Sequence, residues 1–220
     1  MSQMKLMPKE ARYSVRLSYV MFPLEFRDIR GTLAKRGFDL AEVGPIPPRP
    51  TGISFSGELG RKGESVVYMS IPENRFGTMS KSLKQAVGTF EELSEAFTTE
   101  LGTSLHSNVW YYEVAVHYLC DTGSSPVEKI GKIVKNNPYY SEFSKVLGRD
   151  MSTFSVRLSP MNKIPNREEW LDIAIEHDAL SNFYHVGVVF RNPEKRHVEE
   201  FVSNLEKKIE ELIQIVEGKE

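Results

Sequence analysis

Polar side chains at alternating positions in the stretches that read as β-strands are the part of this sequence best suited to chemistry. Because successive side chains of a strand point to opposite faces of its sheet, such positions collect on one face. An arginine there can hold an anionic group through two parallel hydrogen bonds. The residues that we expect to contact a ligand or a partner are Arg16, Arg157, Glu113, His117, Asp172 and Glu176. The wider polar set of this face adds Ser14, Ser18, Ser54, Ser56, Glu58, His185 and Arg191.

Several roles fit this polar face. We favour a non-catalytic binding or assembly protein, whose partner is a second copy of the chain, another protein or a small ligand. One alternative is an enzyme that acts on a charged small molecule through an Arg/Glu/His site on the same face. Another is the binding of single-stranded nucleic acid through Tyr139, Tyr140 and the basic loops, since aromatic rings stack on bases.

Motifs for metal, cofactor or nucleophile chemistry do not stand out in the sequence. None of the five histidines has the spacing of a metal-binding motif, so we predict neither a metal site nor a cofactor. Glu113 and His117 share a strand face, but four residues of extended chain separate them by about 13 Å. There is no GxSxG nucleophile motif. The glycines at 57–63 belong to a hairpin tip, whereas a phosphate-binding loop joins a strand to a helix.

The composition is typical of a globular protein. The chain has 220 residues, of which 40% are hydrophobic and 26% charged. A net charge of −2 argues against a dedicated duplex-DNA binder, which usually carries a basic excess. No window is apolar enough to span a membrane and no apolar signal core is present, so we expect a soluble cytoplasmic protein without a membrane partner. The single cysteine, Cys120, stands in an apolar-rich strand and is expected to be buried and unreactive.

Hydrophobic periodicity predicts the elements that position these residues. In the first part we expect strands at 12–22, 52–59 and 64–71, a hairpin turn at 60–63, and helices at 23–36 and 80–101. In the second part we expect strands at 109–120, 153–159, 170–177 and 184–191. The expected helices are one at 126–134 that is capped by Ser124 or Ser125, a short one that ends at 147, and one final helix from 192 onward. Alternation places Trp110 and Tyr112 together in the core.

The order of strand, helix, strands and helix therefore occurs twice. We expect a loose leader at 1–10, a first half at 11–105 and a second half at 106–220. The predicted fold is α+β, with the two halves forming one curved antiparallel sheet that carries helices on one face. This order resembles the saddle of the TATA-binding protein family, or a pair of ferredoxin-like units. The resemblance is architectural and does not imply TATA-box binding, which needs a basic, apolar sheet face with wedge aromatics.

Overall fold

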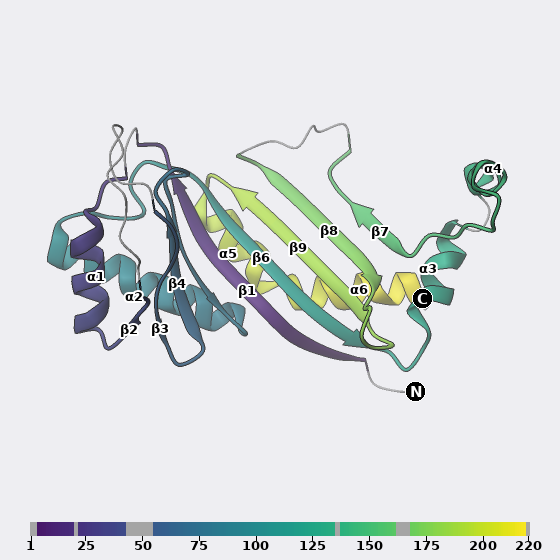
Figure 1. Ribbon diagram of the computed structural model, residues 1–220, viewed down its shortest axis with the longest axis horizontal. Helices are drawn as coiled ribbons and strands as arrows, with labels where there is room; N and C mark the ends of the chain where they lie inside the picture. The colour runs from purple at the N-terminus through teal and green to yellow at the C-terminus, as the bar shows by residue number, and fades with distance from the viewer. Residues whose placement is uncertain (1–3, 20–21, 43–54, 135–136, 162–167, 219–220) are drawn as a thin grey trace.

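The chain builds a single antiparallel sheet with helices packed against one of its faces (Figure 1). The structure, a computed structural model, describes residues 4–19, 22–42, 55–134, 137–161 and 168–218. Within these residues it has nine strands: β1 (Lys5–Leu17), β2 (Asp39–Leu40), β3 (Ser56–Lys62), β4 (Ser65–Ser70), β5 (Arg75–Ser80), β6 (Val109–Asp121), β7 (Ser155–Leu158), β8 (Trp170–His177) and β9 (Tyr184–Asn192). The six helices of this part are α1 (Phe26–Lys35), α2 (Leu83–Leu101), α3 (Pro126–Val134), α4 (Pro138–Leu147), α5 (Lys195–Ser203) and α6 (Leu205–Glu217).

The two longest strands, β1 and β6, pair at the middle of the sheet. The strand order is β2-β3-β4-β5-β1-β6-β9-β8-β7, and every pair is antiparallel. Two register shifts interrupt the central pair, one between Pro8 and Glu10 and one between Arg16 and Leu17. A proline has no N–H to donate to the ladder, which is why it is tolerated beside such an irregularity.

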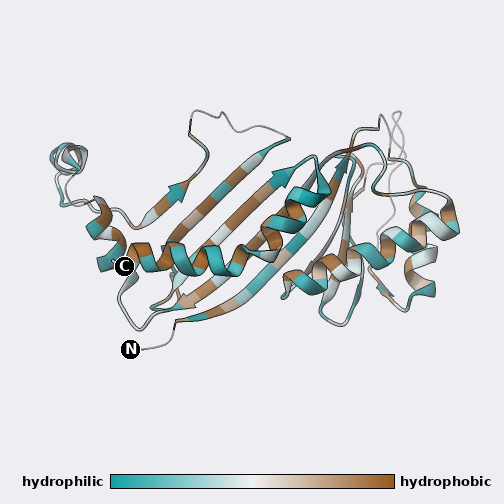
Figure 2. Ribbon diagram, turned by 180° about the vertical axis from the view of Figure 1, so that it is seen from behind, coloured by the Kyte–Doolittle hydropathy of each residue, from teal (hydrophilic) through white to brown (hydrophobic). Residues whose placement is uncertain are grey.

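Aromatic packing fixes the helices to the sheet. The ring of Tyr13 on β1 meets the ring of Phe90 on α2 edge to face, with the centroids 5.0 Å apart. In the second half, Phe190 on β9 stacks on Phe201 of α5 at 4.1 Å. Figure 2 shows α2, α5 and α6 on this side of the sheet, with apolar residues along them. The opposite side carries no helix in the described part of the chain, and we call it the open face.

A hydrogen-bonded chain joins α2, β6 and α5 on the helix side of the sheet. His106 lies between the hydroxyl of Tyr112, at 3.1 Å, and the carboxylate of Glu91 on α2, at 3.0 Å. The other oxygen of Glu91 pairs with Lys195 of α5 at 2.9 Å. Because Glu91 belongs to α2 and Lys195 to α5, this ion pair links two helices that are far apart in the sequence.

Several elements differ from the sequence expectation. β1 begins at Lys5, so the strand takes in most of the stretch expected to be a loose leader, because that stretch pairs with the end of β6. β5 was not predicted, although its place in the sheet is next to β1. The final helix is two helices, since the chain breaks at Asn204. The α+β class and the antiparallel sheet are as predicted.

Candidate functional site

The six predicted contact residues all lie on the open face. Directly opposite residues of neighbouring strands share a face. One row crosses the sheet through Glu58, Tyr68, Gly77, Ser14, Glu113, Arg191 and Trp170. Arg16 and Asp172 each lie in a separate parallel row. His117 shares a third row with Arg157, and Glu176 shares a fourth with His185. Of the wider set, Ser56 also lies in the row of Arg16, Ser18 follows the end of β1, and Ser54 lies outside the described residues.

These residues form three separate groups rather than one convergent site. Glu10, opposite His117, is six residues from Arg16 along β1, which corresponds to about 20 Å of strand. Arg157 is on β7, four strands from β1, or roughly 19 Å across the sheet. Arg16 and Arg157 therefore do not grip one small anion together.

The first group surrounds the carboxylate of Glu113, and we call it the Glu113 cluster: Arg75, Tyr111, Glu113 and Arg191. Arg75 donates to one oxygen of Glu113 at 2.6 Å, and Arg191 donates to the other. Arg75 also donates to the Tyr111 hydroxyl at 3.1 Å, while the Arg191 guanidinium lies 5.2 Å from the centre of the Tyr111 ring. The Glu113 side chain is only 10% exposed. One carboxylate thus separates two arginines that would otherwise repel each other.

Arg16 adjoins this cluster and has no carboxylate partner among the described residues. Its guanidinium lies 4.4 Å from the centre of the Trp110 indole, and its buried Nε has no hydrogen-bond partner there. The Trp110 Nε1–H donates to Glu168 at 2.5 Å. A cation held against an aromatic face keeps its charge and several N–H donors. Arg16 is therefore the cation of the open face that is most able to receive an anionic group.

The position of Trp110 corrects the sequence expectation. Arg16 pairs with Tyr111 and Leu17 pairs with Val109, so Trp110 is an extra residue in β6. Such a bulge interrupts the alternation of side chains. Trp110 consequently contacts Arg16 on the open face, whereas Tyr112 packs in the core as predicted.

Beside the Glu113 cluster, the absence of a side chain on Gly77 makes room for Tyr68. A Cβ on Gly77 would lie 2.6 Å from the Ser14 Cβ and 2.6 Å from the Tyr68 hydroxyl. The hydroxyl end of Tyr68 on β4 therefore lies over Gly77 on β5 and reaches Ser14 on β1. Burial raises the pKa of Tyr68 and outweighs a hydrogen bond with Ser14, which lowers the pKa. Tyr68 is thus a neutral phenol at neutral pH.

The second group is a hydrogen-bonded row, the histidine row, formed by His117, His185 and Glu176. The imidazole Nδ1 of His117 lies 3.1 Å from Nε2 of His185, and the two rings are stacked within 8° of parallel. The Nδ1 of His185 lies 2.8 Å from the Glu176 carboxylate. Burial, and next the neighbouring His185, lower the pKa of His117, so this imidazole is neutral at pH 7.

The third group is the ion pair between Arg157 on β7 and Asp172 on β8. Arg157 Nε and one Nη donate to the two Asp172 oxygens at 2.8 and 2.5 Å. The Arg157 side chain is 74% exposed, so this pair is accessible but its charge is already neutralised. The expectation that Arg157 acts as a second anion clamp is thus weakened by its partner.

Metal ligation finds no support in the part of the chain that the structure describes. No three His, Cys, Asp or Glu side chains there are placed to hold a metal ion. Nor does any described helix combine the length and apolar character that crossing a bilayer requires.

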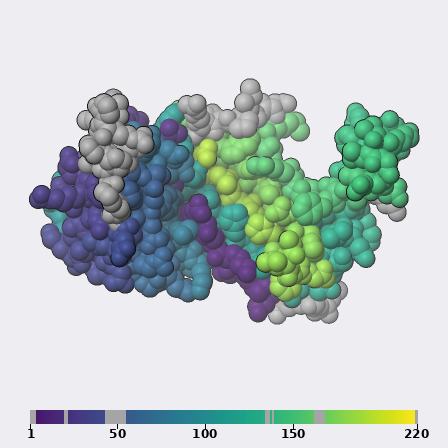
Figure 3. All heavy atoms as spheres, viewed as in Figure 1, coloured from purple at the N-terminus to yellow at the C-terminus, as the bar shows by residue number. Residues whose placement is uncertain are grey.

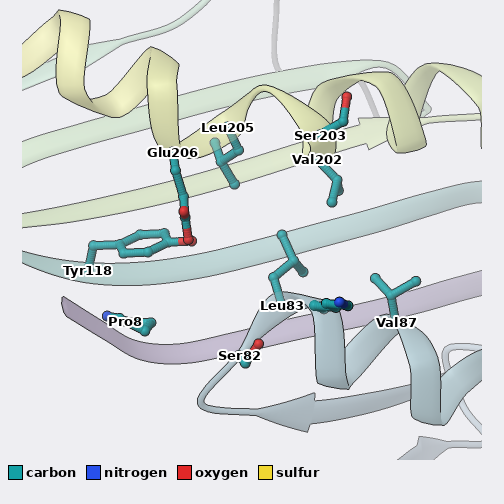
Figure 4. Close-up of a pocket in the computed structure, with 10 residues that line it drawn as sticks. Pro8, Ser82, Leu83, Val87, Tyr118, Val202, Ser203, Leu205 and Glu206 are labelled. Atoms are coloured by element: carbon teal, nitrogen blue, oxygen red, sulfur yellow. The ribbon is translucent and has the colours of Figure 1, made fainter. Parts of the chain in front are cut away.

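A cavity of about 330 Å³ lies on the helix side, away from all the predicted residues (Figure 4). It is bounded by the start of α2, by the α5–α6 junction and by β1 and β6. Leu83, Val87 and Val202 supply apolar walls. The Tyr118 hydroxyl donates to Glu206 at 3.2 Å across one side. The cavity therefore sits between α2 and the junction of α5 with α6.

Sequence reasoning missed Arg75, Tyr111 and the partnership of Arg191 with Glu113. Arg75 lies on β5, which was not predicted, and Tyr111 was not assigned to the open face. A signal was present in the alternation of β6 itself, because Tyr111, Glu113 and His117 have the same parity. Comparisons with known protein families, with curated proteins and with solved structures find no match for this chain.

Proposed function

We propose that this protein is a non-catalytic binding or assembly protein that uses the open face of its sheet. The observation that carries the proposal is Arg16, a half-buried guanidinium with no carboxylate partner among the described residues, beside the Glu113 cluster. We infer that Arg16 receives an acidic group of the partner.

The balance of charges on the open face supports a protein or small polar partner over nucleic acid. Arg157 is paired with Asp172, Arg12 with Glu10, and two further arginines share Glu113. A nucleic-acid surface gains affinity from many unpaired cations that displace counterions from phosphates. Here most cations of the face are neutralised within the chain, which favours recognition through shape and a few charged contacts.

We also propose that the two halves are related by duplication, as the repeated element order led us to expect. In support, β5, β4 and β3 follow β1 outward on one side, and β9, β8 and β7 follow β6 on the other. The open face would then present two related surfaces that meet at β1 and β6. Superposition of the halves tests this, and a fit limited to single strands would contradict it.

The histidine row supports a second candidate, an enzyme that acts on a charged small molecule. A neutral imidazole such as His117, held by a second histidine and a carboxylate, can accept a proton. Turnover of a panel of charged metabolites, followed by NMR, tests this. Activity that is lost in His185→Asn and kept in Arg157→Ala would favour the enzyme.

Binding of acidic probes tests the leading proposal. The probes are a poly-glutamate peptide, inorganic phosphate and a single-stranded oligonucleotide, each followed by thermal shift and by calorimetric titration. The variants are Arg16→Ala, Arg157→Ala and the double replacement. We expect Arg16→Ala to weaken peptide binding roughly 10-fold or more, because the variant loses one charge-assisted hydrogen bond. Arg157→Ala is the matched control, because Asp172 already occupies that guanidinium.

The outcomes separate the alternatives. Equal binding of the peptide by wild type and Arg16→Ala, or no binding of any probe, would contradict the proposal. Preferential binding of the oligonucleotide would favour the nucleic-acid alternative. Global unfolding is not expected, because a single replacement typically costs about 0.5–3 kcal/mol, and circular dichroism confirms that each variant remains folded.

A further inference from the structure

Helix α4 exposes a stripe of large apolar side chains. Tyr139, Phe143, Val146 and Leu147 are 67%, 53%, 83% and 55% exposed. Their spacing places them on one side of the helix. Figures 1 and 3 show α4 standing out from the rest of the molecule, beyond α3. Monomeric proteins rarely leave a contiguous apolar surface of this kind uncovered.

The sequence nevertheless specifies α4 as a helix. The Asn137 side chain accepts a hydrogen bond from the Tyr139 N–H at its start, and Gly148 ends it in a left-handed conformation. A helix of ten residues is marginal in water by itself and normally depends on packing of its apolar side. The caps and the apolar stripe together indicate a helix made to pack against something.

An apolar groove lies on the helix side of the sheet, between β8 and α6. It has a volume of about 240 Å³. Leu171 and Ile173 of β8 form one wall, and Ile209, Leu212 and Ile215 of α6 form the other. Ile215 is 71% exposed, and Leu158 of the neighbouring β7 is 40% exposed. The groove is therefore open to an apolar side chain from outside.

At the other edge of the sheet, a helix occupies the position that corresponds to this groove. There α1 lies beside α2 on the outer strands (Figure 2), with Ile29 and Leu33 fully buried. In the second half α3 covers only the end of β8, and the groove occupies the remaining space beside α6. By analogy with α1, a helix that presents an apolar stripe would fit this groove.

We propose that the groove between β8 and α6 binds helix α4 of a second copy of this chain. The two unpartnered apolar surfaces of one molecule complement each other, so each copy supplies one helix and one groove. Exchange in both directions gives a closed two-fold dimer in which both surfaces are covered.

Charge sets the direction of the docked helix. The groove carries two charged residues, Lys208 and Glu211. Helix α4 carries Glu142 and Lys145, which pair with each other at 3.1 Å and have the same spacing as Lys208 and Glu211 with the opposite order of charge. With the two helices parallel, Glu142 faces Lys208 and Lys145 faces Glu211. Helix α4 therefore docks with Glu142 beside Lys208.

Sedimentation of the full chain over a range of concentrations tests the proposal. We expect a dimer for the wild type, and dissociation constants at least 10-fold weaker for Phe143→Asp on α4 and for Ile215→Asp in the groove. Leu180→Asp is the matched control, because Leu180 is 96% exposed and lies in neither surface. Circular dichroism confirms that each variant remains folded.

Mixing the variants distinguishes this contact from other dimers. A mixture of Phe143→Asp and Ile215→Asp retains one intact helix-in-groove contact, so it should associate more tightly than either variant alone. Lys208→Glu should weaken the dimer, and Glu142→Lys in the same chain should restore it. A wild type that stays monomeric at every concentration would overturn the proposal. So would a dimer that is insensitive to Ile215→Asp, which would indicate helix pairing between two copies of α4.

Discussion

The carboxylate of Glu217, near the end of α6, provides a sharp test of how the helix layer is held on the sheet. One of its oxygens lies 2.5 Å from the hydroxyls of Tyr184 and Ser124, and 3.1 Å from that of Thr122. Lys129 of α3 lies 3.6 Å from the other oxygen. The Glu217 side chain is 2% exposed. These contacts join the end of α6 to β9, to the turn after β6 and to α3.

Replacing Glu217 with Gln keeps the shape and removes the charge. A hydrogen bond to a charged group contributes about 1.5–3 kcal/mol, against about 0.5–1.5 kcal/mol for a neutral one. Weakening two short hydroxyl contacts by this difference lowers the free energy of unfolding by about 2–3 kcal/mol. For a chain of this size the melting temperature falls about 2–4 °C per kcal/mol, so we expect a loss of roughly 5–10 °C.

The loss should depend on pH in a defined direction. Burial alone would raise the pKa of Glu217, but the hydrogen bonds from Ser124, Tyr184 and Thr122 and the charge of Lys129 outweigh it and lower the pKa. A carboxyl group with a lowered pKa in the folded state stabilises the protein above its unfolded pKa, which is about 4.3. That contribution disappears as the pH falls through the folded pKa.

Thermal unfolding of wild type and Glu217→Gln, followed by circular dichroism from pH 7 to pH 3, measures this effect. The difference in melting temperature should be constant above about pH 5 and shrink below pH 4. Glu206→Gln is the control, because Glu206 is on the same helix and accepts from Tyr118 at the longer distance of 3.2 Å. A Glu217→Gln variant that melts with the wild type at pH 7, or a difference that grows on acidification, would refute the reasoning.

Three other predictions concern the sheet. Gly77→Ala should lose about 1–3 kcal/mol of stability in chemical denaturation, because its Cβ would overlap Tyr68, whereas Gly88→Ala on α2 meets no atom within 4 Å and should not destabilise. Glu113→Gln should lose about 1–2 kcal/mol by leaving two arginines close together, and added sulfate should raise the melting temperature of this variant more than that of wild type. Cys120 is fully buried, so Ellman's reagent should label it at the rate of global unfolding; labelling within seconds in native buffer would contradict this.

The alternation of polar and apolar residues was the sequence pattern that predicted most about the strands and their faces. Strand 170–177 was predicted with its observed bounds, and the six polar residues assigned to one face all lie on it. A period of two depends only on local geometry, so it can be read without knowing which strand pairs with which. Burial of Cys120 was confirmed for the same reason, because its neighbours of the same parity are apolar.

Features that depend on distant pairing were not predictable in this way. The stretch RFGTMS of β5 contains Gly77 and little hydrophobic periodicity, and it becomes a strand because β1 and β4 bracket it. Missing β5 meant missing Arg75, and with it the way that Glu113 is held. The bulge at Trp110 likewise arises from the register between β1 and β6, which no local pattern encodes.

The central pairing of β1 with β6 has a consequence for how the chain reaches its fold. Lys5 pairs with Asp121, so the ribosome must synthesise more than half of the chain before this contact can form. Until then β1 presents one edge of unpaired N–H and C=O groups, a template on which other chains can assemble. Contacts of such large sequence separation also slow folding, because a long loop must be closed first. We therefore expect nascent chains stalled before Val109 to aggregate or to be held by chaperones, and chains long enough for β6 to pair with both β1 and β9 to escape both.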